Sequence, residues 1–148
     1  MKKILLILTL FLYSCGYQPI YINKNLNNLE FAEIVLKGEK DLNRIIIESL
    51  SLKESESNLS LNKIQITTNT LIEETSKNSK GQVQTYRTII NVELLITKNG
   101  ELIKSKIFME DFSYNSRDNK FELVEYQDEV RDDIIKKIIE EIVIYLNI

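Results

Sequence analysis

The stretch that decides the fold is residues 83–112, VQTYRTIINVELLITKNGELIKSKIFMEDF. Even positions of its first half carry mostly apolar side chains, which predicts a long β-strand over 83–97 with one buried face. These positions are Tyr86, Thr88, Ile90, Val92, Leu94 and Ile96. Asn99-Gly100 then predicts a two-residue type I′ turn, because both central residues of that turn need positive φ. The chain is therefore expected to fold back as a β-hairpin.

The turn also predicts which residues face each other, because a two-residue loop sets the hairpin register. Facing residues then have numbers that sum to 199. The pairs are Ile96 with Ile103, Val92 with Ile107 and Ile90 with Met109 on the apolar face, and Glu93 with Lys106 on the other. One apolar and one charge-matched face result, which favours this register. It leaves Leu95, Phe108 and Phe112 on the side away from the expected core.

Upstream of the hairpin the pattern predicts a strand, a helix and a second strand. The first strand spans 31–36 and ends at Gly38. Asp41 is the expected N-cap of a helix that ends near Lys53. Its apolar face comprises Leu42, Ile45, Ile46, Ser49 and Leu50. The second strand spans 61–72, with Ile64, Ile66, Thr68, Thr70 and Ile72 on one face, and a polar loop follows over 73–82.

Downstream, a loop over 113–120 precedes a long helix over 121–146. Its apolar stripe comprises Leu123, Val130, Ile134, Ile135, Ile138, Ile139, Ile142 and Leu146. Ion pairs are expected at Asp132–Lys136 and Asp133–Lys137. The stripe is too short and too wide for a coiled-coil seam, which favours packing on the sheet. The order β-α-β-β-β-α predicts a two-layer α+β domain whose four-stranded sheet is covered on one face by two helices.

Composition excludes several classes of function. The 148 residues contain no His and one Cys, so the chain has no Ser-His-Asp or Cys-His catalytic pair and no zinc site of the usual Cys and His ligands. Lys and Arg number 19 against 22 Asp and Glu, and the net charge of −3 argues against a general nucleic-acid binder. Four scattered glycines form no phosphate-binding loop. We therefore expect a binding or assembly protein without a cofactor, not an enzyme.

The chain begins with two lysines and an apolar run over 4–13. At about 1.5 Å per residue this run is too short for a bilayer core of roughly 30 Å, so it indicates an export signal, with a buried helix or strand as the alternative. Leu12-Tyr13-Ser14-Cys15 resembles a bacterial lipobox. That resemblance implies cleavage before Cys15, acylation of its thiol and new amino group, with palmitate among the acyl chains, and, because Gly16 follows, the outer membrane.

These patterns predict that the chain is divided into three segments. Residues 1–14 are a lipoprotein signal peptide, 15–28 a lipidated tether, and 29–148 a single α+β domain. The domain is expected on the periplasmic side of the outer membrane.

The sequence also resembles the alphaproteobacterial LptE family of lipopolysaccharide-assembly lipoproteins. The most specific likeness is Cys15-Gly16-Tyr17-Gln18-Pro19-Ile20-Tyr21. Tyr86-Arg87-Thr88, the tight turn, Phe112-Ser113-Tyr114-Asn115 and the helix from Glu125 to Ile142 follow in the family's order. Family members have two helices against a four-stranded sheet. The resemblance implies a plug that assists assembly of the LptD-type outer-membrane β-barrel and takes part in lipopolysaccharide insertion.

Four basic residues are the expected contacts for lipopolysaccharide phosphates. The family places basic residues in the loop that matches Lys77 and Lys80, and near the start of the last helix, where Arg117 or Lys120 stands here. Ordinary solubilising roles are the alternative for each of them. A lipid-binding accessory lipoprotein of another envelope transport system is the alternative function, and it predicts an apolar pocket between helix and sheet.

Overall fold

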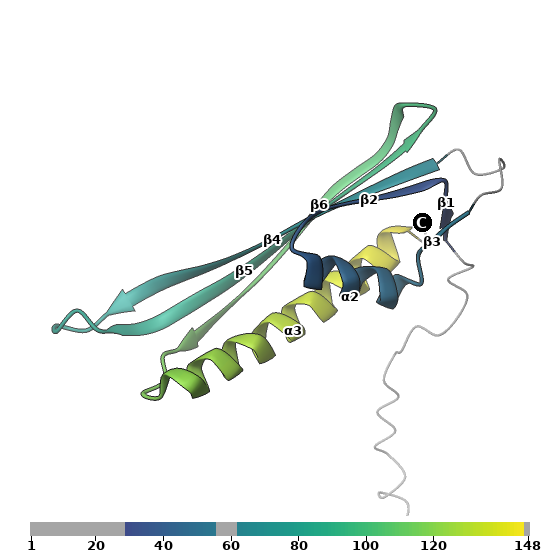
Figure 1. Ribbon diagram of the computed structural model, residues 1–148. Coiled ribbons are helices and arrows are strands. Elements are labelled where there is room, and N and C mark those ends of the chain that lie inside the picture. Colours follow the sequence, from purple (N-terminus) through teal and green to yellow (C-terminus); the bar gives the residue numbers. More distant parts are fainter. Residues whose placement is uncertain (1–28, 56–61, 147–148) are drawn as a thin grey trace, which may run out of the picture.

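The computed structural model describes residues 29–55 and 62–146 (Figure 1). The predicted signal peptide, Cys15 and the tether lie outside the described residues. Helices α2 and α3 pack on one face of a four-stranded sheet of order β2-β4-β5-β6, in which β2 and β4 are parallel and the other pairs antiparallel. The bounds are β2 Glu33–Gly38, α2 Lys40–Leu50, β4 Asn62–Lys77, β5 Val83–Lys98, β6 Glu101–Asn115 and α3 Lys120–Leu146. The predicted two-layer α+β architecture is confirmed.

A small second sheet interrupts the predicted first strand. β1 (Glu30–Phe31) pairs with β3 (Lys53–Glu54), and β2 begins two residues after β1 ends. Phe31 and Leu52 are each 5% exposed and join the main core. The small sheet therefore closes one end of the core beside α2.

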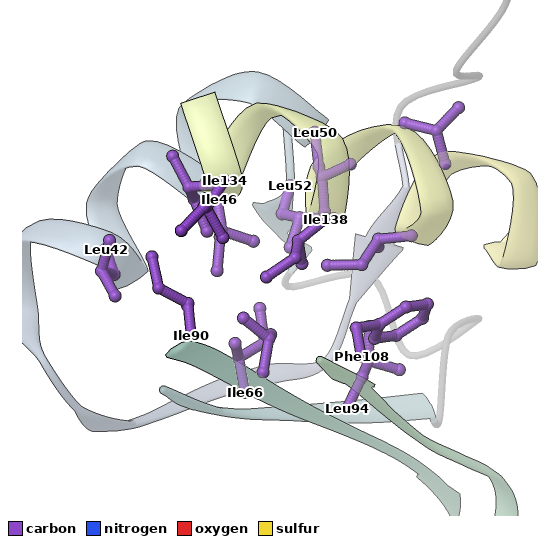
Figure 2. Close-up of a cluster of buried hydrophobic side chains, with 14 of the residues drawn as sticks. Leu42, Ile46, Leu50, Leu52, Ile66, Ile90, Leu94, Phe108, Ile134 and Ile138 are labelled. Atoms are coloured by element: carbon purple, nitrogen blue, oxygen red, sulfur yellow. The ribbon is translucent and has the colours of Figure 1, made fainter. Parts of the chain in front are cut away.

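The core lies between the helices and one face of the sheet (Figure 2). Ile72, expected on the inner face of β4, is 45% exposed, but the other predicted apolar positions at the centre of β4 and β5, Ile64, Ile66, Ile90, Val92 and Leu94, have no exposed surface. Leu42, Ile46 and Leu50 of α2 and Ile134 and Ile138 of α3 point toward them. Burial of such a side chain stabilises the fold by about 1.5–3 kcal/mol.

The stripe of α3 packs on the sheet as expected. Val130, Ile134, Ile135, Ile138 and Ile142 are buried, together with Val143, which the periodicity did not include. The ion pair on its outer side differs from the prediction. Lys136 Nζ lies 3.2 Å from Asp133 Oδ1, three positions back, whereas Asp132 was its expected partner.

The hairpin turn is confirmed, but the predicted register holds for only two pairs. Asn99 and Gly100 have φ of 52° and 85°, as a type I′ turn requires. Lys98 faces Glu101 and Thr97 faces Leu102; a β-bulge then leaves Ile103 unpaired, and Ile96 faces Lys104. One extra residue in one strand moves every later side chain to the other face.

The bulge reverses the faces predicted for β6. Phe108 lies opposite Val92 and is 1% exposed, and Tyr114 is also buried. Ile107 and Met109, expected in the core, are each 63% exposed. Lys106 faces Leu94, so the predicted pair with Glu93 is wrong. The physical reason is that the reversed face buries two large aromatic rings, Phe108 and Tyr114, which the unbulged register would leave in water.

The connection from β2 to α2 differs from the prediction at both ends of the helix. Glu39, not Asp41, is the N-cap, and Asp41 lies in the first turn, 3.6 Å from Arg44. The helix ends at Leu50, where Ser51 adopts the left-handed conformation with φ 50°, earlier than the expected Lys53. Ser49, expected on the buried face, is exposed.

A buried polar cluster holds this connection on β4. Thr68 Oγ1 accepts a hydrogen bond from the backbone N–H of Glu39 at 3.0 Å and lies 3.2 Å from Asn43 Oδ1. Asn43 is 3% exposed, and its Nδ2 donates to the Lys37 carbonyl at 3.0 Å. Buried polar groups need such partners. Asn43 was not expected to be buried, because periodicity ranks positions by apolar character alone.

Candidate functional site

The two loops that carry the predicted basic residues lie at the same end of the molecule. Lys77 pairs with Val83 where β4 meets β5, and Thr85 pairs with Asn115 at the end of β6. The backbone N–H of Ser116 then donates to the Gln84 carbonyl at 2.8 Å. Figure 1 shows the β4–β5 turn and the start of α3 at this end, away from the β5–β6 hairpin. We call it the basic end and define it by Lys77, Lys80, Arg117 and Lys120.

The turn between β4 and β5 is shorter and more ordered than the predicted loop over 73–82. Strand β4 continues to Lys77, so only Asn78–Gln82 connect the strands. Asn78 Oδ1 accepts hydrogen bonds from the backbone N–H groups of Lys80 and Gln82 at 2.9 and 3.0 Å. The Asn78 carbonyl accepts from Gly81, whose φ is 77°. An Asx-type network therefore presents Lys80 at the tip of the turn.

Lys77 and Lys80 differ in their electrostatic surroundings. Lys77 Nζ lies 2.8 Å from Glu74 Oε2. This hydrogen bond and the charge of Glu74 raise the pKa of Lys77 above 10.5, so Lys77 is a paired cation at neutral pH. Among the described residues no ion pair involves Lys80. Lys80 is therefore the better placed of the two for an anionic ligand.

Arg117 rests on a row of tyrosines. Its guanidinium carbon lies 4.6 Å from the centroid of the Tyr126 ring, within cation–π range. Tyr126 packs edge-on against Tyr114 at 5.5 Å between centroids, and Tyr114 stacks on Tyr86 at 6.0 Å. The hydroxyls of Tyr114 and Thr88 are 3.0 Å apart. The two stretches that carry the family resemblance, 86–88 and 112–115, thus face each other across β5 and β6.

Lys120 opens helix α3, and Asn119 provides the cap that the sequence analysis missed. Asn119 Oδ1 accepts a hydrogen bond from the Phe121 N–H at 2.9 Å, and its Nδ2 lies 3.4 Å from Glu122 Oε1. An Asn followed three residues later by Glu was the signal available for this helix start. Lys120 and Arg117 are both exposed.

A groove of about 300 Å³ opens between α3 and β6 beside the basic end. Phe112, Tyr126, Val130 and Ile134 form its apolar wall, and Glu129, Asp133 and Lys137 lie along its edge. Phe112 remains 45% exposed there, although the bulge turns it toward the helix face. The lipid-binding alternative predicts an apolar pocket between helix and sheet, and this groove has that position with a lining that is partly charged.

In the part of the chain that the structure describes, no helix covers the other face of the sheet, and this face is largely polar on the central strands. Thr67 lies beside Glu93 and Asn69 beside Asn91, and Gln65 and Lys63 continue the row. Arg87 Nε donates to Asp111 Oδ2 at 2.8 Å across β5 and β6. This outer face is thus rich in hydrogen-bonding side chains, and its apolar residues include Leu71, Ile89 and Leu95 on β4 and β5 and Ile107 and Met109 on β6.

The Arg87–Asp111 pair gives a pH prediction. The hydrogen bond from Arg87 lowers the pKa of Asp111 below 3.8. The pair stabilises the folded protein fully at pH values above the pKa that Asp111 has in the unfolded chain. This stabilisation is lost as the pH falls through the lower pKa of the folded state. Carbon-13 NMR should therefore show Asp111 titrating below pH 3.8. R87Q should return the pKa of Asp111 to its ordinary value, and R44Q should not; equal behaviour of both variants would contradict the pairing.

Within residues 29–55 and 62–146, no group of three or more His, Cys, Asp or Glu side chains is placed to hold a metal ion. In the same part of the chain neither helix has the length and apolar character needed to span a membrane.

Comparison with solved structures shows that this fold recurs in bacterial lipoproteins. Rare lipoprotein B from Shewanella oneidensis is similar over 78% of this chain and 93% of its own, with a TM-score of 0.62 and 14% identity. A minor lipoprotein from Acinetobacter baumannii is similar over 80% and 90%, with a TM-score of 0.58 and 13% identity. Lipoprotein B from Nitrosomonas europaea is similar over 80% and 86%, with a TM-score of 0.54 and 18% identity. At these identities the likeness shows the fold. No protein-family model and no curated protein sequence matches the chain.

Proposed function

We propose that this chain is an outer-membrane lipoprotein, acylated at Cys15, that plugs the lipopolysaccharide-exporting β-barrel of the LptD type and assists its assembly. The observation that carries the proposal is the uncovered polar face of β4 and β5. A water-filled or plugged barrel has a polar interior, and a plug inside it must offer hydrogen-bonding groups. Thr67, Asn69, Asn91 and Glu93 provide such groups on a rigid sheet. The fold is also the one that the resemblance to the LptE family predicts.

The experiment that tests this function is purification from the native outer membrane. A tagged, full-length protein should co-purify with a large outer-membrane β-barrel, and its depletion should reduce mature barrel and surface lipopolysaccharide. Replacing the outer-face pair Asn69 and Asn91 with leucine should weaken co-purification, because buried polar groups of the barrel would lose their partners. Isolation of a stable monomer without any barrel, with surface lipopolysaccharide unchanged on depletion, would refute the proposal.

Acylation of Cys15 can be tested separately. Because the thiol at Cys15 is the only one in the chain, C15A should abolish metabolic labelling with a palmitate analogue and remove the protein from the outer-membrane fraction. G16A is the matched control and should retain the label. Label that persists in C15A would show that the lipobox interpretation is wrong.

In this proposal the basic end contacts phosphates of lipopolysaccharide on their way through the barrel. Lysine and arginine side chains on an ordered turn and a helix start can each pair with phosphate oxygens. The Asn78 network holds the backbone of Lys80 at the tip of the turn, and the Tyr126 ring lies under the guanidinium of Arg117.

Reversal of charge at the turn should weaken lipopolysaccharide binding. K77E with K80E is expected to lower affinity about tenfold or more, because two cations that can pair with phosphate oxygens are replaced by two anions that repel them. K40E with K53E is the matched control, since it changes the net charge equally at exposed positions outside the basic end. Binding can be measured with the purified lipoprotein and fluorescent lipopolysaccharide. Equal affinities of the two double variants would assign Lys77 and Lys80 a solubilising role only.

The groove beside α3 favours a second candidate, a lipid-binding accessory lipoprotein of another envelope transport system. E129W would place an indole ring in this groove from an exposed position, without touching the core or the polar outer face. If E129W abolishes lipid binding while co-purification with a barrel is absent in the unmodified protein, this second function is supported over the first.

A further inference from the structure

The tip of the β5–β6 hairpin carries two large apolar side chains in water. Leu102 and Ile103 are 61% and 50% exposed, next to the Asn99-Gly100 turn and at the opposite end of β5 from the basic end. Leu102 lies opposite Thr97 on the outer side of the sheet, and Ile103 is the unpaired residue of the bulge before Lys104. Exposed apolar side chains that cluster on an edge strand are expected to contact a partner or a membrane when the protein functions.

The residues next to the tip in the chain are mostly basic, with Lys104 and Lys106 on the helix side of β6 and Leu102 on the outer side. Residues 98–107 contain three lysines, Lys98, Lys104 and Lys106, and one acid, Glu101. Lys104 and Lys106 lie with Nζ 5.4 and 5.5 Å from the centroid of the Tyr145 ring, and Lys106 Nζ is 4.0 Å from Glu141. Apolar residues flanked by lysines with long flexible stems are typical of segments that lie at a membrane surface.

The hairpin tip lies at the end of the domain where the described chain begins. The backbone N–H of Ala32 donates to the Asn62 carbonyl at 2.8 Å, and Asn62 pairs with Lys98. Figure 1 also shows β1 and the hairpin at the same end. Residues 16–28 join Leu29 to Cys15, and a chain of that length spans at most about 45 Å. A lipid anchor at Cys15 would therefore keep this end, rather than the basic end, near the bilayer.

We propose that the tip of the β5–β6 hairpin, with Leu102 and Ile103, inserts into the headgroup region of an anionic bilayer as a second membrane contact. The inference rests on the proposed acylation of Cys15. A bilayer fits the tip better than a barrel lumen does, because the lumen is polar, whereas the interface accepts apolar side chains and attracts lysines. The contact orients the sheet so that the basic end points away from the anchored leaflet.

A fluorescent probe at Ile103 tests this contact in the full, acylated protein. The acylated Cys15 has no thiol, so I103C is the single labelling site for an environment-sensitive fluorophore. The protein is reconstituted in vesicles of phosphatidylethanolamine and phosphatidylglycerol that contain a lipid-borne quencher. We expect a blue shift and loss of fluorescence at position 103. S79C on the exposed β4–β5 turn is the matched control and should keep the fluorescence of a probe in water.

The outcomes separate this inference from the proposed function. An unacylated Cys15, detected by mass spectrometry, or failure of the protein to float with vesicles overturns the proposed function and the inference together. Flotation of acylated protein with an unquenched probe at position 103 overturns the inference alone. A probe that becomes shielded only when an outer-membrane barrel is present assigns the tip to a protein partner and overturns it too. Quenching in phosphatidylcholine vesicles equal to that in anionic ones would overturn the role of the lysines.

Discussion

Replacement of Gly38 with alanine is expected to destabilise the domain by about 3 kcal/mol or more. A Cβ at this position would lie 1.9 Å from the carbonyl oxygen of Thr68, a backbone atom that cannot move without breaking the pairing of β2 with β4. The φ of Gly38 is also 85°, a conformation that L-residues rarely adopt. The free energy of unfolding, measured by urea denaturation and circular dichroism, should fall accordingly, or the variant should fail to fold.

Gly81 provides the matched control for this prediction. Its φ of 77° is as unusual as that of Gly38, but apart from its two chain neighbours no described residue has an atom within 4 Å of an added Cβ. In G81A the free energy of unfolding should therefore fall only by the cost of holding an alanine at positive φ, about 1–2 kcal/mol. Similar losses in G38A and G81A would show that the close approach of the two strands at Thr68 is not as described.

Replacement of Phe108 with alanine is the second variant with a large expected effect, about 3–5 kcal/mol. The ring is 1% exposed and packs edge-on against Tyr145 at 5.7 Å between centroids. I107A, at the next position, should change stability by no more than about 0.5 kcal/mol, because Ile107 is 63% exposed. The comparison uses the same denaturation measurement.

This pair of variants also tests the β-bulge. With the register in which facing residues sum to 199, Ile107 would lie in the core and Phe108 would face away from it. The order of the two effects would then be reversed. A larger loss for I107A than for F108A would therefore contradict the bulge at Ile103 and the outward position of the hairpin's apolar residues.

Much of the architecture follows from periodicity and turn chemistry. Alternation over 83–97 predicts the inner face of β5, the stripe over 123–146 predicts the side of α3 that packs, and Asn99-Gly100 predicts the turn. These features depend on neighbouring residues and on φ preferences, which act over a few positions along the chain. For the same reason Gly38 was expected to end a strand, and it does.

The candidate site was predicted only in its residue types. Lys77 and Lys80 belong to one loop and Arg117 and Lys120 to another, and only the pairing of Thr85 with Asn115 brings these loops to one end of the sheet. The ion pair of Lys77 with Glu74 and the packing of Arg117 on Tyr126 likewise have no signature in the spacing of residues.

Local pattern thus accounts for the two helices and the four strands of the main sheet, for their order, and for the buried positions at the centre of β4 and β5, but not for the small sheet of β1 and β3. Local pattern does not determine which face of β6 is buried, because both registers of the hairpin are compatible with the turn and both bury apolar side chains. Contacts with α3 decide between them, since Phe108 and Tyr114 reach Tyr145 and Tyr126 only when Ile103 bulges out. Packing between segments distant in the chain outweighs the regular pairing next to the turn, and it also leaves Ile107 and Met109 exposed.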